Sequence, residues 1–491
     1  MKLTLGVALA LGSGCAQILG IDSTSGASDA PPMSPQAMAE VQRVSIGATL
    51  QTAPEDLTAG SDTLAFLVAD SSAPGGFTSV AATQGPTGTW TAPIATGNPV
   101  VDFTLSQQRH IWAFPTRDLK IADTHLEHPN PTPADPSSLL AVMVALPSLP
   151  SATESFQIQE IGPWLEADLD PTDPLSQLVM TSTMMPLPGA SSTPAAVIPT
   201  DVVLALGYDS GLEPGGLVLT DVFQAASFAE TAGTNSVSGA MTAVTADQMF
   251  GATIDQVTQQ TRFAAIRPAV GTPTFSWQVT AASDAMRNLV VGPLLESGAA
   301  ATGDTAIAAM YGNPFASLGW TAQFSYTATE VRDIMVNGLA LELPATASSL
   351  LIPDASMPML DFPAALPQTI SINGQPLSTD NMMVTLDPTM PVTLSAVVDR
   401  QSSQLYEAIL YEVVPADTMN AQLSQVLEIL TTDPTSLVIP GGVLATGQPY
   451  TVWIGCYADG FSGAATGDLQ TTSPPFDSAG TYSGVFTVSN P

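Results

Sequence analysis

The chain has 491 residues, of which 45% are hydrophobic and only 11% charged, and its 44 acidic against 10 basic residues give a formal net charge of −34. This length and apolar content are enough for roughly three domains with cores of their own, which excludes wholesale disorder. The negative charge would repel phosphate backbones, so nucleic acid is excluded as a partner.

Proline and glycine interrupt the chain throughout, with 42 Pro and 38 Gly residues. Between them lie short runs rich in β-branched and aromatic residues. This alternation of strand-like runs and turn residues predicts a mainly β protein, built from several β-sandwich modules of immunoglobulin or fibronectin type III type.

Residues 1–14, MKLTLGVALALGSG, have the pattern of a signal peptide. Lys2 provides the positive charge, and Leu3–Leu11 form an apolar run that ends in three small residues. The run is far shorter than the about 20 residues that a membrane-spanning helix needs. We therefore expect export followed by cleavage before Cys15.

Small residues followed by a cysteine at this place resemble the lipobox of bacterial lipoproteins, although Gly12 stands where that family prefers leucine. The resemblance implies that Cys15 is diacylated and anchors the protein in a membrane. Two or more acyl chains give a stable anchor. Because Ala16 and not Asp follows the cysteine, the resemblance also implies that the protein is sorted to the outer membrane or cell surface. The alternative is a plain secretory signal with an incidental cysteine.

Residues 15–41 are small, polar and interrupted by proline, which predicts a flexible tether. Residues 42–135 contain short β-prone runs such as TLAFLVAD and PVVDFTLS, and we expect them to form one β-sandwich. A Pro-rich joint, EHPNPTPADP, ends this first domain.

Residues 136–361 form a larger β-rich central domain, whose subdivision stays open. Its strand-like runs include TDVVLALGY and TFSWQVTA. Residues 245–268 are ambiguous, because Thr245 suits a helix cap whereas the β-branched content that follows suits a strand.

Residues 362–491 show the clearest alternation and predict a β-sandwich as C-terminal domain, closed by a last strand over 480–489. The run LATGQPYTVWI resembles the strand E–F corner of fibronectin type III domains. The resemblance implies that the hydroxyl of Tyr450 bonds back to the backbone near Leu444. The period-2 rule places Cys456 on the same face as Tyr450, so its thiol should be buried.

Three histidines lie within one short region: His110, His125 and His128. Together with Asp123 and Glu127 they provide nitrogen and oxygen ligands of the kind that zinc accepts. Their spacing does not match the metalloprotease motifs, and the Pro-rich joint follows at once. The alternative is that His125 and His128 are solvated loop residues.

The run EADLDPTDP spaces Asp168, Asp170 and Asp173 as oxygen ligands of Ca²⁺ can be spaced. It lacks the glycine and the closing glutamate of an EF-hand loop, and its two prolines also fit a solvated turn. Calcium therefore stands beside zinc as a candidate ion, and we expect no cofactor.

The sequence contains no nucleophile motif, phosphate-binding loop or dinucleotide fingerprint. We expect a non-enzymatic, lipid-anchored envelope or surface protein that binds an envelope protein or a glycan, or that has a structural role. The alternative is a secreted or anchored hydrolase, acting on carbohydrate or dependent on a metal, with its site in residues 100–350. A pocket that joins the histidines with a carboxylate would favour the hydrolase.

Overall fold

A computed structural model describes residues 36–491 with internal gaps, the longer of which are 55–62, 126–131, 147–152, 170–176, 187–195, 283–290 and 298–303. Residues 1–35 lie outside the described residues, and with them the predicted signal peptide, Cys15 and most of the predicted tether.

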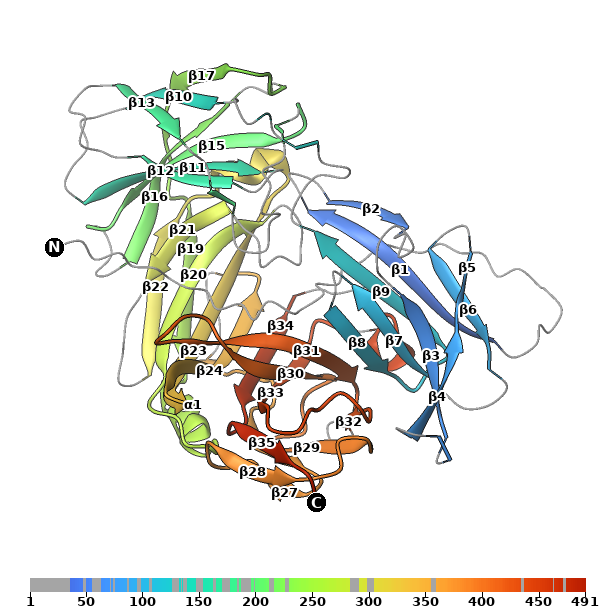
Figure 1. The fold of residues 1–491 in the computed structure, drawn as a ribbon. Coiled ribbons are helices and arrows are strands. Elements are labelled where there is room, and N and C mark those ends of the chain that lie inside the picture. The colour runs from blue at the N-terminus through green and yellow to red at the C-terminus, as the bar shows by residue number, and fades with distance from the viewer. Residues whose placement is uncertain are drawn as a thin grey trace.

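The protein is mainly β, as predicted: 63% of it is strand, in several antiparallel sheets, with one short α-helix. Figure 1 shows three groups of strands, one from the N-terminal, one from the central and one from the C-terminal part of the chain. In the described part of the chain, two short 3₁₀ helices, Pro314–Leu318 and Ala464–Thr466, lie between strands.

The N-terminal sheet is built around strand β1 (Gln36–Ile46). β1 begins inside the range expected to be a tether, which corrects the expectation for residues 36–41. Ala37, Ala39 and Val41 are fully buried, because these small apolar side chains alternate toward the core. The strands of this sheet besides β1 are β2 (Leu50–Pro54), β5 (Thr83–Gln84), β6 (Thr89–Pro93) and β9 (Asp118–His125), the last parallel to β1.

A second, 20-stranded sheet runs through all three parts of the chain. Its N-terminal strands are β3 (Leu64–Ala69), β4 (Phe77–Ala81), β7 (Val100–Leu105) and β8 (Gln108–Ala113). Its central strands are β11 (Glu154–Ile161), β12 (Leu165–Leu169), β14 (Met185–Pro186), β15 (Val202–Asp209), β16 (Gly216–Gln224), β18 (Thr242–Ala243), β20 (Thr274–Ala282), β21 (Val291–Ser297), β23 (Thr321–Val336) and β24 (Leu339–Leu351). Its C-terminal strands are β28 (Met382–Thr385), β30 (Leu405–Pro415), β31 (Ala421–Thr431), β33 (Pro449–Asp459), β34 (Phe476–Tyr482) and β35 (Phe486–Ser489).

Two strand pairings join the parts of this sheet. β8 lies parallel to β31, which connects the N-terminal and C-terminal strands and which we call the first seam. β24 lies antiparallel to β34, which connects the central and C-terminal strands and which we call the second seam. The three expected domains therefore share one hydrogen-bonded ladder.

Three smaller sheets complete the fold. Their strands are β13 (Gln177–Ser182), β10 (Leu139–Ala145) and β17 (Thr234–Ala240) in one, β22 (Thr305–Tyr311), β19 (Gln248–Ile254) and β25 (Met359–Leu360) in the next, and β27 (Gln375–Pro376), β26 (Pro367–Ile372), β29 (Val392–Val398) and β32 (Leu437–Ile439) in the third.

Helix α1 (Gln256–Ala264) lies inside the segment that the sequence left ambiguous. It begins after Asp255 and not after Thr245, which lies between strands β18 and β19. The Asp255 carboxylate accepts a hydrogen bond from the amide of Thr258 at 2.9 Å, which caps the first turn.

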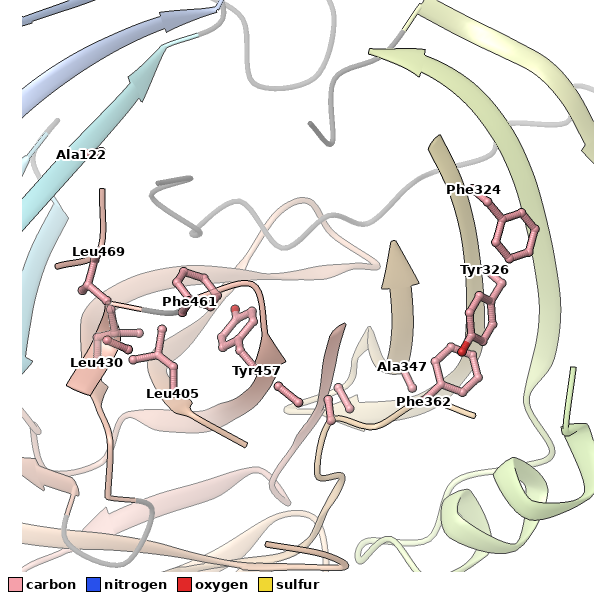
Figure 2. Packing of buried hydrophobic residues seen from close by; sticks show 14 of the residues in the cluster. Ala122, Phe324, Tyr326, Ala347, Phe362, Leu405, Leu430, Tyr457, Phe461 and Leu469 are labelled. Atoms are coloured by element: carbon pink, nitrogen blue, oxygen red, sulfur yellow. The ribbon is translucent and has the colours of Figure 1, made fainter. Parts of the chain in front are cut away.

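The hydrophobic core crosses the expected domain boundaries. One cluster of buried side chains contains residues from all three parts of the chain (Figure 2), among them Ala122, Phe324, Tyr326, Ala347, Leu405, Tyr457 and Leu469. A second cluster fills the space between β26 and β29 on one side and β30, β31 and β33 on the other. It forms the core of the C-terminal domain.

The chain ends in two strands and not in the single strand expected over 480–489. The break falls at Gly484, whose amide donates to the carbonyl of Leu377. A Cβ at Gly484 would lie 2.1 Å from the carbonyl oxygen of Thr379, so only glycine allows this approach. β34 consequently pairs with β24, whereas β35 pairs with β28.

Candidate functional site

The first seam buries a histidine against a carboxylate. His110 of β8 stands directly opposite Glu428 of β31 in the parallel register. Its Nδ1 lies 3.2 Å from Oε2 of Glu428, and the two residues are only 6% and 1% exposed. The imidazole also stacks on Phe103, with the ring centroids 5.0 Å apart.

The alternation of β8 explains why a histidine is buried here. Ile111 points into the core of the C-terminal domain, and His110 and Trp112 point to the opposite face of the sheet. That face is covered, so a polar side chain on it needs a polar partner. Glu428, on a strand more than 300 residues away in the chain, places a carboxylate oxygen at ion-pair distance from this imidazole.

The second seam buries another carboxylate. Asp477 of β34 is 1% exposed and stands opposite Ser349 of β24. Burial raises the pKa of Asp477 from 3.8 to about 7, with smaller contributions from Asp459 and Asp361, and a hydrogen bond from Ser349 opposes the increase. This carboxyl group therefore changes its charge near neutral pH.

Tyr326, in the central strand β23, lies beside this carboxyl group. Its ring packs on Phe362, with the centroids 4.4 Å apart (Figure 2), and its hydroxyl donates to the carbonyl oxygen of Asp361. Burial raises the pKa of the Tyr326 hydroxyl, so it stays protonated and remains a donor.

Arg262 of helix α1 forms a third buried contact between the central and C-terminal parts. Its guanidinium donates to Asp399 at 2.5 Å and to the carbonyl oxygens of Phe362 and Ala364 at 2.8 and 2.6 Å. Asp399 also accepts from the amide of Leu366 at 2.8 Å. The planar guanidinium thus ties three points of the C-terminal domain to one helix.

These three contacts share one arrangement, because each buried ionisable group comes from one part of the chain and its partner from another. Such contacts can hold sheets in a fixed register. The candidate site is therefore this set of buried polar contacts at the junctions.

The predicted histidine cluster is only partly covered by the structure. His110 contacts Glu428, as described. His125 ends β9, with its backbone opposite Ser45, but its side chain and the whole of His128 lie outside the described residues. Among the residues that the structure describes, no three His, Cys, Asp or Glu side chains are placed to hold a metal ion.

The predicted calcium run is covered still less. Asp168 lies in β12 opposite Gln157 of β11, and its side chain is outside the described residues. Asp170 and Asp173 lie wholly outside the described residues. Calcium binding there stays a prediction.

Two predictions for the C-terminal domain are confirmed. Cys456 is free and fully buried, and burial raises the pKa of its thiol. The hydroxyl of Tyr450 accepts a hydrogen bond from the amide of Ala445 at 3.0 Å, directly after the buried Leu444. The corner expected from the sequence is therefore present.

Glu428, Asp477 and Arg262 did not emerge from the sequence. A signal existed for Glu428, because it is the one charged residue in the strand sequence AQLSQVLEILT. A charge in such a run marks a covered position with a partner elsewhere, but nothing in the run identifies that partner as His110.

No protein-family model matches this chain, and no curated protein sequence resembles it detectably. Within the described residues, no helix combines the length and apolar character needed to cross a membrane.

Proposed function

We propose that this chain is a lipid-anchored protein of the bacterial outer membrane or cell surface, with a binding or structural role and no catalytic one. The observation that carries the proposal is Cys15, placed directly after a signal-like segment in a chain with only one other cysteine. Diacylation of Cys15 would provide the membrane anchor.

The second cysteine supports this assignment indirectly. Cys456 is fully buried and its thiol pKa is raised, which suits a structural position in the core. Cys15 would then be the residue with a chemical role, and that role is attachment.

The arrangement of the folded part supports a binding or structural role. Its ionisable groups contact one another across the junctions: the buried His110 with Glu428, and the buried Arg262 with the partly exposed Asp399. A continuous ladder and a shared core would hold the outer loops and strand edges in fixed positions, as a scaffold for recognition requires. We infer that the partner is an envelope protein or a glycan.

The finer description of the fold belongs to the same proposal. The corner at Tyr450 and the core between two facing sheets support a C-terminal β-sandwich of fibronectin type III type. We propose sandwich modules of this general kind for the N-terminal and central parts as well.

Metabolic labelling tests the anchor. In a Gram-negative host fed with labelled palmitate, wild type should carry the label and fractionate with the outer membrane. Cys15→Ala should lose the label and leave the membrane fraction, whereas the matched variant Cys456→Ala should keep both. Label that persists in Cys15→Ala, or wild type that is unlabelled, would contradict lipidation at this residue.

Photo-crosslinking on intact cells tests the binding role. With wild type anchored, crosslinkers at exposed loop positions should yield a discrete adduct with an envelope protein or a glycan. Only self-adducts, or none, would contradict a binding role. A purified protein that hydrolyses envelope glycans would contradict the non-catalytic assignment.

A further inference from the structure

We propose that the first seam contains a binding pocket for the end of an alkyl chain. A cavity of about 80 Å³ lies where β3, β4, β7 and β8 meet β31 and β32. The inference concerns a second, non-covalent site and does not depend on the lipid at Cys15.

The floor of the cavity is apolar. It is formed by buried side chains from both sides of the seam: Leu67, Ile111, Ile429 and Leu437. Ile111 and Ile429 are register partners in β8 and β31, so the parallel pairing itself builds the floor. The pocket therefore exists only when the two parts of the chain are joined.

The rim differs from the floor, because its side chains are half-buried. Phe77 of β4, Val100 of β7 and Val438 of β32 line it. The β3–β4 hairpin is held close to the C-terminal domain at Gly76, where a Cβ would lie 2.8 Å from Cγ of Pro391. A ligand can thus enter at the rim and keep its polar end in water.

The chemistry of the lining selects the ligand. Among the described residues that line the pocket, Thr431 is the one with a polar side chain, and its hydroxyl already accepts from the amide of Asp433 at 3.2 Å. Water needs two to four polar partners to occupy a cavity, whereas apolar cavities take apolar guests. An unbranched alkyl end fits these walls, and a charged or hydroxylated end does not.

Methyl NMR of the full chain carrying Cys15→Ala tests the pocket, with 1-hexanol as the probe. The methyl signals of Ile111 and Ile429 should shift in a saturable manner. The signal of Ile370, which lies in the same core but does not line the pocket, should not. The matched probe 1,6-hexanediol should bind at least tenfold more weakly, since one hydroxyl would have to leave water.

Filling the pocket provides the second arm. Ala113→Leu places a larger side chain on the wall and should abolish the shifts, whereas Ala81→Leu, at an exposed position of β4, should retain them. Val100→Leu fills the pocket from the rim and serves if Ala113→Leu does not fold. The proposal would be overturned if the Ile111 and Ile429 signals did not shift, or if 1,6-hexanediol bound as tightly as 1-hexanol. It would also be overturned if the shifts persisted in both Ala113→Leu and Val100→Leu.

Discussion

Nδ1 of His110 lies 3.2 Å from Oε2 of Glu428, in a pair that joins the first and the last third of the chain. Both side chains are almost completely buried, and they stand in register in two parallel strands. The parallel pairing of β8 with β31 therefore carries a buried polar pair at its first register position.

A double-mutant cycle on this pair should reveal its coupling. Glu428→Leu alone should lower the free energy of unfolding by about 1–3 kcal/mol, because the imidazole of His110 loses its partner. The double variant Glu428→Leu with His110→Phe should lose less free energy of unfolding than the two single variants lose in total. The difference, which is the coupling energy, should be about 0.5–3 kcal/mol. Chemical denaturation measures all four proteins.

The matched control is the pair Arg109–Asp102, which joins neighbouring strands at a more exposed position. Its coupling should stay below about 1 kcal/mol, as for surface ion pairs. Equal coupling in the two cycles would show that burial at the first seam adds nothing.

Asp477 should make stability depend on pH. Its pKa is about 7 in the folded protein against 3.8 unfolded, so the folded state holds the proton more tightly. The contribution of this group is fully present below about pH 4 and is lost as pH rises toward 7. Urea midpoints between pH 4 and 8 should therefore fall less steeply in Asp477→Asn than in wild type.

The control for this prediction is Asp387→Asn. Asp387 is exposed, and hydrogen bonds from the side chain and the amide of Thr389 lower its pKa. This variant should retain the decrease between pH 4 and 7. A wild-type slope in Asp477→Asn would show that another group titrates there.

Arg262 should be among the residues least tolerant of substitution. Arg262→Ala removes the donor of the Asp399 carboxylate and of the carbonyls of Phe362 and Ala364, and we expect a loss of about 1–3 kcal/mol. Arg262→Lys keeps the charge but loses the planar set of donors, so it should recover only part of this stability. Arg267→Ala is the control, because this exposed side chain donates only to carbonyls of its own neighbourhood, and it should change stability by less than about 0.5 kcal/mol.

The corner of the C-terminal domain depends on one hydroxyl. Tyr450→Phe removes the acceptor of the Ala445 amide while the ring remains packed near Phe486. We expect a loss of about 0.5–1.5 kcal/mol with an unchanged denaturant slope, because the fold persists. A change within about 0.5 kcal/mol would mean that the amide finds another partner.

Local pattern was sufficient for much of the fold. Alternation placed strands near residues 404–414 and 450–460 and put Cys456 and Tyr450 on one buried face, as the structure confirms. It failed at residues 36–41, where small alanines fill a tightly packed sheet and carry little hydropathy signal. It failed again at Gly484, whose break depends on the close approach of Thr379.

By itself, the sequence determined the mainly β character and the orientation of side chains along each strand, because both follow from the nearest residues. It also supplied the prediction that Cys15 carries a lipid. Only the tertiary structure decided that His110 faces Glu428, that Asp477 is enclosed and that Arg262 reaches Asp399. These contacts connect strands far apart in the chain, and the pairing of such strands is set by the packing of the whole molecule.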